Sequence, residues 1–315
     1  MFFGNNAGLL SYDGYNWDLT RMPSGQKARS CKVVGKRVYV GCFQEFGYFE
    51  RDKFGRFIYH SLWKSLKNYR PHNDEIWNII EAPNGHILFQ SFCSWFDYDG
   101  HTVTAHYDGK HLPLYFFRVG NEVWAQLIGD GLYKLKGNQY EPLVNRADLG
   151  NDDVVSVLAL DAHRRLLVTS EHGLYVLANG QLSSFANTLI ADLAVAHANR
   201  AVVTRDGTIV IGTIKGGIYG LDASGNLKWH YDMRTMLKNN TVLRLFCDNN
   251  NNVWAAFDSG IALVHSGSPL SLLSNATAPL GMVYDVCFSA DAMYIASNQN
   301  VVMSNGCLPD KCVFS

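Results

Sequence analysis

The amino-acid sequence predicts an all-β fold, a β-propeller of four-stranded antiparallel blades, and three observations carry that prediction. One pattern recurs along the chain: an apolar strand, a short polar break, then glycine followed by apolar and tyrosine-like residues. Successive copies are 37 to 47 residues apart, the extremes being Ser94 to Gly131 and Gly47 to Ser94. Asp-Gly and Asn-Gly pairs between apolar runs are typical of tight hairpin turns. A period near 40 residues with several strands in each copy is typical of a propeller.

The recurring glycine marks the third strand of each expected blade. The pattern is clear from Val210, where the chain reads Val-Ile-Gly-Thr-Ile-Lys-Gly-Gly-Ile-Tyr. In two weaker copies Ser94 and Asn300 occupy the place of the glycine. The six marker glycines are Gly8, Gly47, Gly131, Gly173, Gly217 and Gly260.

The third copy shows all four strands of a blade. We expect strands A to D at residues 75–81, 86–92, 95–98 and 102–106, with hairpin turns at Asn84-Gly85 and Asp99-Gly100.

Other segments fit the same scheme. Residues 154–160 and 242–247 are nearly all apolar, which favours inner strands covered by neighbouring blades on both faces. Trp77, Trp124 and Trp254 are expected in the core between blades. Residues 62–67 suit one helical turn, and no segment shows the periodicity of a long amphipathic helix.

The domain organisation follows from the ends of the repeat. We expect residues 1–315 to form a single propeller domain, a fragment of a longer protein, because the first blade lacks its inner strand A. Residues 283–288 would complete that blade and close a seven-bladed ring, which we favour over a ring of eight.

Composition excludes several function classes. The 315 residues carry a formal charge of −1 and no long basic run, so this domain offers no electrostatic surface for nucleic acid. No apolar run reaches the length needed for membrane insertion, and the first ten residues lack the features of a signal peptide. The seven cysteines contain no Cys-x-x-Cys pair; Cys307 and Cys312 flank a turn and would be bridged only in an oxidising compartment.

The chain shows no assembled catalytic or metal-binding motif. A Gly-x-Ser-x-Gly elbow is missing, and the 248–252 run of Asp and Asn lacks the glycine and distal glutamate of a calcium loop. His101, His106 and His111 are spaced five apart, which on strands and turns does not gather three imidazoles. We therefore expect no catalytic residues, no metal and no cofactor.

The repeats resemble the two-component regulator propellers of Bacteroidetes sensor proteins. The Gly-Leu-Tyr and Gly-Ile-Tyr endings carry this resemblance, and residues 2–17 and 38–49 look like the opening blades of sensors with a triple-tyrosine domain. That family has periplasmic propellers, a following transmembrane helix, and a LuxR-type or hybrid histidine kinase output. The resemblance implies a periplasmic location, an inner-membrane anchor in the full-length protein, and glycan ligands.

Blade topology indicates where a ligand would bind. In an antiparallel blade the D-to-A and B-to-C connections emerge on one face, and these connections hold the chemically richer side chains, including an exposed indole at Trp95. Planar amides and carboxylates suit sugar hydroxyls, although Asn and Asp are also common as plain turn residues. The candidate ligand-binding residues are Gln44, Glu45, Arg70, His72, Asn73, Asp74, Trp95, Asp130, Asp152, Glu171, His172, Lys215, Asn240 and Asp258.

We therefore interpret the chain as a non-enzymatic, periplasmic ligand-sensing domain of a signal-transduction and transcription regulator. Its expected partners are an oligosaccharide or other polar ligand, further domains of the same polypeptide, and a second copy in a homodimer. A propeller glycoside hydrolase or lyase and a protein-interaction scaffold remain the alternatives, since several carboxylates could face one channel.

Overall fold

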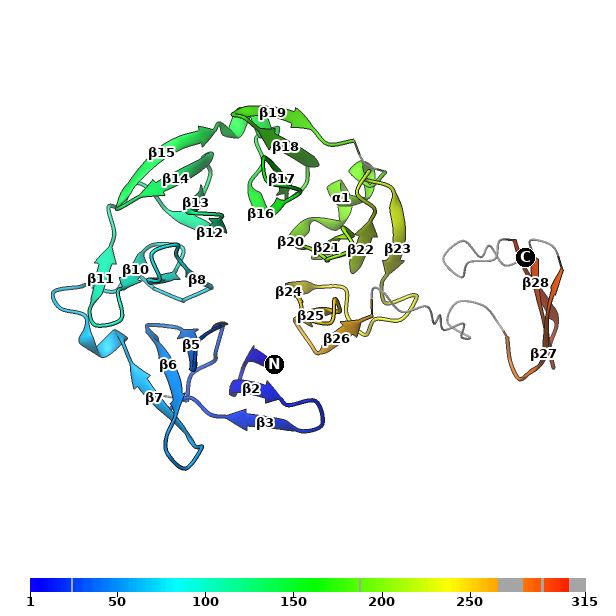
Figure 1. Cartoon of the computed structure of the whole chain (residues 1–315), viewed down its shortest axis with the longest axis horizontal. Coiled ribbons are helices and arrows are strands. Elements are labelled where there is room, and N and C mark those ends of the chain that lie inside the picture. The colour runs from blue at the N-terminus through cyan, green and yellow to red at the C-terminus, as the bar shows by residue number, and fades with distance from the viewer. Residues whose placement is uncertain (24, 187, 266–279, 290–291, 306–315) are drawn as a thin grey trace. The chain divides into compact units, whose positions relative to one another are not determined.

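The computed structural model describes residues 1–23, 25–186, 188–265, 280–289 and 292–305. Their regular secondary structure is almost entirely antiparallel strands (Figure 1), which confirms the predicted fold class. Contacts divide the chain into two compact units, Met1–Val157 with Gly180–Leu182, and Leu158–Asn179 with Ser183–Ser315. Each unit is built of sheets whose strands pair in chain order, and the described residues contain eight such sheets.

The first unit contains one three-stranded and three four-stranded sheets. Their strands are β1 (Phe2–Asn5), β2 (Gly8–Tyr12) and β3 (Trp17–Thr20); β4 (Ser30–Val34), β5 (Arg37–Cys42), β6 (Glu45–Arg51) and β7 (Phe57–Ser61); β8 (Asn78–Glu81), β9 (Ile87–Gln90), β10 (Trp95–Tyr98) and β11 (Val103–His106); β12 (Pro113–Val119), β13 (Glu122–Leu127), β14 (Leu132–Lys136) and β15 (Gln139–Val144). Two 3-10 turns, η1 (Trp63–Ser65) and η2 (Arg146–Leu149), lie in connections.

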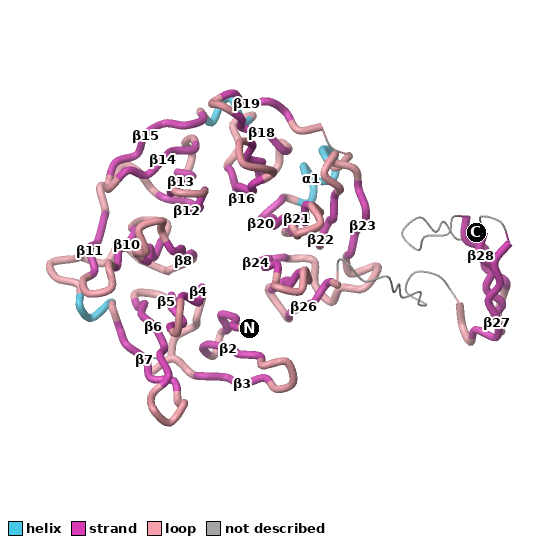
Figure 2. Tube along the Cα trace, viewed as in Figure 1, coloured by secondary structure: helices cyan, strands magenta, loops and turns pink. Residues whose placement is uncertain are grey.

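The remaining strands form four further sheets (Figure 2). They are β16 (Val154–Ala159), β17 (Arg164–Thr169), β18 (Leu174–Ala178) and β19 (Gln181–Ser184); β20 (Ala198–Val203), β21 (Ile209–Thr213), β22 (Ile218–Leu221) and β23 (Leu227–Tyr231); β24 (Val242–Cys247), β25 (Val253–Phe257) and β26 (Ile261–Val264); β27 (Val283–Ser289), β28 (Ala292–Ser297) and β29 (Val301–Asn305). The short helix α1 (Ile190–Ala196) precedes β20.

Main-chain carbonyl groups of the neighbouring strand explain why glycine occupies the marker position at Gly47, Gly131 and Gly217. Gly47 is the third residue of β6, and a Cβ atom there would collide with the carbonyl oxygen of His60 on β7. Gly131 meets the carbonyl of Val144 in the same way, and Gly217 meets that of Tyr231. In these three sheets the fourth strand therefore approaches the third so closely that the slot has no room for a side chain, whereas Gly173 and Gly260 have open space at the same position.

The aromatic residue beside the slot makes a second recurring contact, a ring stack across the third and fourth strands. Tyr48 faces His60 at 4.9 Å between ring centroids, and Trp95 faces His106 at 3.8 Å. In the second unit Tyr219 stacks on His230 at 3.9 Å with 8° between the ring planes. In these three sheets an aromatic residue just after the slot is thus the cross-strand partner of a histidine.

The hydrophobic core lies between successive sheets. Phe46, Phe89 and Phe96 fill the space between the second and third sheets of the first unit. In the second unit Val210 and Val253 occupy the corresponding place between β20–β23 and β24–β26. Burial on both sides of a sheet explains the apolar inner strands.

The hairpin turns follow the predicted chemistry. The Asp52 carboxylate accepts the N–H groups of Phe54 and Arg56, and Gly55 takes a positive φ of 81°. Asp248 accepts the N–H groups of Asn250 and Asn252 in the same arrangement, so this run of polar residues is a turn.

Two expectations need correction. Strand β24 has the predicted bounds but is not covered on both faces, because Leu243 and Phe246 are 46% and 53% exposed. Residues 283–288 do not complete the first sheet in the described part of the chain: they belong to β27, which opens the sheet β27-β28-β29, while the first sheet has the order β1-β2-β3. Cys307 and Cys312 lie outside the described residues.

Candidate functional site

A B-to-C and a D-to-A connection, which topology predicts on the same face, contact each other in the first unit. Gln44, in the turn between β5 and β6, donates its backbone N–H to the carbonyl of Asp74 in the connection from β7 to β8, at 2.7 Å. Gln44 and Asn73 both take positive φ values, 48° and 62°, which close this contact. The structure therefore brings together the predicted residues Gln44, His72, Asn73 and Asp74.

Asp74 is fully buried and holds its loop in place. Its Oδ1 accepts a hydrogen bond from the Ser91 hydroxyl at 2.8 Å. Its Oδ2 accepts the Tyr69 hydroxyl and the His72 backbone N–H, each at 2.8 Å. Because protein donors occupy both oxygens, Asp74 shapes the loop.

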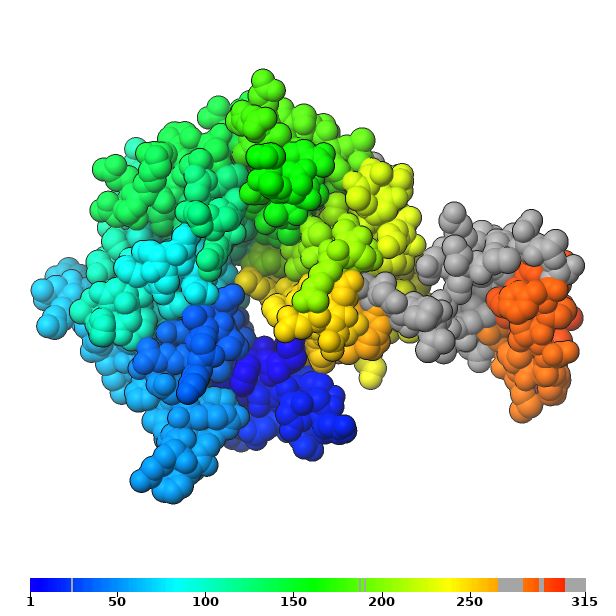
Figure 3. Space-filling view, viewed as in Figure 1, coloured from blue at the N-terminus to red at the C-terminus, as the bar shows by residue number. Residues whose placement is uncertain are grey.

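The loop held by Asp74 supports a neighbouring aromatic ring. The imidazole of His72 stacks on Tyr107 with 3.7 Å between centroids and 17° between planes. Arg70 and Asn73 are exposed on the same connection, which protrudes from the surface of the first unit in light blue (Figure 3). Predicted loop residues thus position Tyr107, which the sequence analysis did not name.

Tyr107 lies at the edge of a cavity of about 260 Å³, which we call the Trp95 cavity. Its walls come from β10, β11, the connection after β11, and β15 with the turn before it. The lining residues are Trp95, Ala105, His106, Tyr107, Asp108, His111, Asn138 and Tyr140.

The expectation of an exposed indole at Trp95 is wrong. Trp95 is the first residue of β10 and is 4% exposed, since His106 covers one ring face and Phe116 packs edge-on at 5.7 Å. Only part of its ring reaches the cavity wall. Burial also lowers the pKa of His106, so this imidazole is neutral at physiological pH.

One hydrogen-bond donor of the Trp95 cavity is unpaired. The Tyr140 hydroxyl is buried and donates no hydrogen bond within the described residues, and the polar group beside it is the Trp95 indole, which can only donate. Burial raises the pKa of this phenol, which therefore keeps its proton as a hydrogen-bond donor. At the rim, His111 Nδ1 and Asp108 Oδ2 pair at 2.6 Å. A buried donor left without an acceptor is costly unless a ligand or water supplies one.

The other predicted acidic residues of the first unit have structural partners. Asp130 accepts the Gly131 N–H at 2.8 Å and the Tyr133 hydroxyl at 2.9 Å. Asp152 is buried and accepts the Asp153 N–H. Glu45 differs, because it is the first residue of β6 and lines a separate cavity.

In the second unit the structure joins two predicted residues through a third. His197 places Nδ1 2.8 Å from Glu171 Oε1 and Nε2 2.9 Å from Lys215 Nζ. His197 directly follows α1 and has a φ of 56°. Nothing in the sequence indicates that unusual backbone conformation, so the link between Glu171 and Lys215 could not be predicted.

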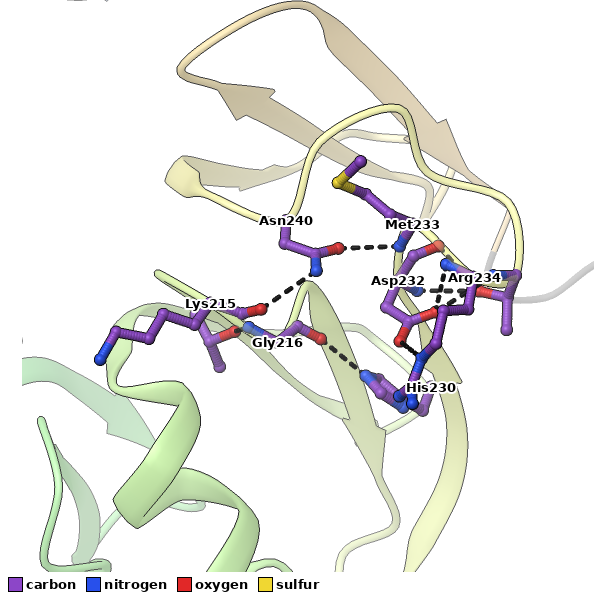
Figure 4. A network of polar contacts seen from close by, with 9 residues as sticks. Lys215, Gly216, His230, Asp232, Met233, Arg234 and Asn240 are labelled. Carbon is purple, nitrogen blue, oxygen red and sulfur yellow. Dashed lines mark hydrogen bonds and ion pairs between the residues drawn. The ribbon is translucent and has the colours of Figure 1, made fainter.

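Asn240 ties two loops of the second unit together. Its side-chain amide donates to the Lys215 carbonyl at 3.0 Å and accepts the Met233 N–H at 2.8 Å (Figure 4). Asp258 is exposed and bonds through its backbone N–H to Thr241, and exposed His172 follows Glu171. These residues order the loops around Lys215.

The missed residues of the Trp95 cavity fall into three groups, the first being Ala105 and His106 on the fourth strand β11. Tyr107, Asp108 and His111 lie in the connection that follows a fourth strand, where the topology rule would have found them. Asn138 and Tyr140 come from the neighbouring sheet, and only the packing of two sheets brings them in. The described residues contain no group of three His, Cys, Asp or Glu side chains placed to hold a metal ion.

Comparisons with solved structures support the fold. Two crystal structures of the extracellular domain of BT4673 of B. thetaiotaomicron, described as a putative hybrid two-component system in one and as a putative one-component system in the other, give TM-scores of 0.63 and 0.64 at 16% identity. They match 99% and 100% of this chain but 44% of the solved domain, so the chain spans less than half of its length. The WD40 β-propeller domain of Doa1 gives 0.62 at 10% identity, over 85% of this chain and 89% of that domain.

Two further comparisons found no match. No protein-family model matches the chain, and no curated protein is significantly similar to it. Among the described residues, none of the helices has the length and apolar character to cross a membrane. The structural likeness agrees with the resemblance of the repeats, and this chain has the β-propeller fold found in the extracellular domains of two-component systems.

Proposed function

We propose that this chain is the periplasmic ligand-sensing region of a signal-transduction regulator, and that it recognises a glycan through the Trp95 cavity. The coarse part of the proposal is supported by the shared fold with extracellular domains of putative two-component systems. The finer part rests on the unpaired Tyr140 hydroxyl in the cavity wall.

The cavity chemistry suits sugar hydroxyls. A hydroxyl both donates and accepts hydrogen bonds, and the wall offers the Tyr140 donor, the Asn138 amide, the neutral His106 and the Asp108 carboxylate. Aromatic rings supply apolar faces for the C–H side of a sugar ring. A volume of about 260 Å³ accepts one ring, and a longer glycan would continue past Tyr107 at the rim.

Signalling would follow from ordering the rim. A sugar against Tyr107 stiffens its stack on His72 and hence the loop that Asp74 holds. The bound state would then be passed to further domains of the polypeptide that control transcription. A single propeller domain over residues 1–315 and a homodimer remain part of this proposal.

Isothermal titration with an oligosaccharide panel tests the proposal. For a sugar that binds, Tyr140→Phe should weaken affinity about 3- to 10-fold, because one hydrogen bond is lost. Tyr15→Phe is the control, since Tyr15 is 92% exposed and remote from the cavity wall. Unchanged affinity in Tyr140→Phe would remove the Trp95 cavity from the proposal, and turnover of a bound glycan would favour an enzyme.

A further inference from the structure

A second cavity of the first unit has a different chemistry. It measures about 530 Å³ and is lined by Pro23, Glu45, Tyr59, His60, Ser61 and Lys64. Its walls come from the connection after β3, the start of β6, the end of β7 and η1. We call it the Glu45 cavity, and its size lies within the range of small-molecule sites.

The Glu45 carboxylate is buried, and only one of its oxygens has a partner. The residue is 7% exposed. Oε1 accepts hydrogen bonds from the Tyr59 hydroxyl at 2.9 Å and from the Ser61 hydroxyl at 2.7 Å. Oε2 makes no hydrogen bond or ion pair with the described residues, and the carboxylate forms part of the cavity wall.

No cation among the described residues forms an ion pair with the Glu45 carboxylate. Burying a carboxylate without a positive partner is unfavourable, and neutral hydroxyl donors compensate only in part. The Glu45 charge also acts on the neighbouring thiol. The pKa of Cys42 is raised to about 12, mainly by burial and secondly by the Glu45 charge. Burial and the same carboxylate raise the pKa of Tyr59, which stays a neutral donor. A cation entering the cavity would find a prepared partner in Oε2.

The rim carries the opposite charge. Lys64 lies on η1 and is exposed, and its ammonium makes no ion pair with Glu45. His60 is also exposed at the rim, where its ring stacks on Tyr48. The cavity therefore presents an acceptor inside and a cationic donor at its mouth, which matches a small molecule with both charges.

We propose that the Glu45 cavity is a ligand site for a small zwitterion of the α-amino acid class, with the ammonium at Glu45 Oε2 and the carboxylate at Lys64. The site is separate from the Trp95 cavity and goes beyond glycan recognition. It adds a second input to the same unit.

Titration calorimetry on the 1–315 chain with glycine, L-leucine, L-glutamate and L-lysine tests this site. Isoamylamine and N-acetyl-L-leucine are matched to leucine, since the first lacks the carboxylate and the second lacks the ammonium. We expect N-acetyl-L-leucine to bind at least about 30-fold more weakly than leucine, because Glu45 loses its charged partner. Isoamylamine should bind about 3- to 10-fold more weakly, because the Lys64 contact is more exposed to solvent.

Two variants assign the charges. Glu45→Gln keeps an acceptor for the Tyr59 and Ser61 hydroxyls. It should weaken the binding of leucine at least about 30-fold. Lys64→Met should weaken leucine about 3- to 10-fold and leave isoamylamine unchanged. The controls are Glu50→Gln, on the same strand and paired with Arg37, and the exposed Lys67→Met.

Several results would overturn the proposal. They are the absence of binding by all four amino acids up to about 10 mM, equal affinity for leucine and its N-acetyl form, or leucine binding unaffected by Glu45→Gln. Tighter isoamylamine binding in Lys64→Met would show that Lys64 itself is the partner of Glu45. Should Glu45→Gln not fold, the comparison of leucine with N-acetyl-leucine still decides. Sugar binding at the Trp95 cavity is a separate measurement.

Discussion

The two cavities of the first unit occupy related places in consecutive sheets and differ in chemistry. In each, a histidine of the fourth strand lines the cavity and stacks across to the third strand, His60 on Tyr48 and His106 on Trp95. Beside the first stack stands a buried carboxylate, and beside the second an unpaired phenol. In the second unit the equivalent His230 donates a hydrogen bond from Nε2 to the Gly216 carbonyl at 2.6 Å. The stack is thus a common support, and the side chains around it decide the ligand.

The largest expected effect concerns the slot that brings the third and fourth strands together. Gly47→Ser should destabilise the chain by about 3 kcal/mol or more, because the new side chain meets the His60 backbone carbonyl. Ser94 occupies that slot in the third sheet, where its hydroxyl pairs with Tyr69 at 2.7 Å. Ser94→Gly should therefore cost only about 1–2 kcal/mol.

Urea unfolding followed by tryptophan fluorescence measures both changes. Similar losses of unfolding free energy in the two variants would show that the second and third sheets do not differ at this slot.

A smaller effect is expected at the loop beside the Trp95 cavity. Asp74→Asn should lower the free energy of unfolding by about 2 kcal/mol, because a charged acceptor of three hydrogen bonds becomes neutral. A less ordered His72 should also weaken ligand binding at the Trp95 cavity, while the affinity for leucine at the Glu45 cavity stays unchanged. Calorimetry with both ligands checks this, and equal loss at the two cavities would contradict their independence.

The smallest effect is a pH dependence of the third sheet. Burial lowers the pKa of His106 in the folded state, whereas the unfolded imidazole takes up a proton near pH 6.5. The unfolded state then binds more protons, so stability is present above about pH 6.5 and declines as the pH falls below it.

His106→Gln should flatten that decline in urea midpoints between neutral and mildly acidic pH, whereas the exposed His101→Gln should keep it. A slope that persists in His106→Gln would place its origin elsewhere.

The sequence predicted the architecture better than the sites, for a physical reason. Turn chemistry and the marker glycine are local, so Trp95–Tyr98 and Val242–Cys247 were assigned with the observed bounds. Topology predicted that the connections holding Gln44 and Asp74 share one face, and the structure adds a direct backbone hydrogen bond between the two residues. Which side chain faces a cavity depends on register across strands and on the next sheet, as with Ser61 beneath Glu45 and Tyr140 opposite Trp95. The positive φ of His197, which lets its ring contact Glu171 and Lys215, has no signal in the sequence.

The close approach at Gly47 has a consequence for how such a protein can change. The slot is a contact between a main-chain carbon and a main-chain oxygen, so it fixes the spacing of two strands without reference to any side chain. A cavity-lining position such as Glu45 can therefore change while the sheet keeps its geometry. A chain of this kind can try new recognition chemistry one sheet at a time, and an engineer can exchange the lining of one sheet while leaving its frame intact.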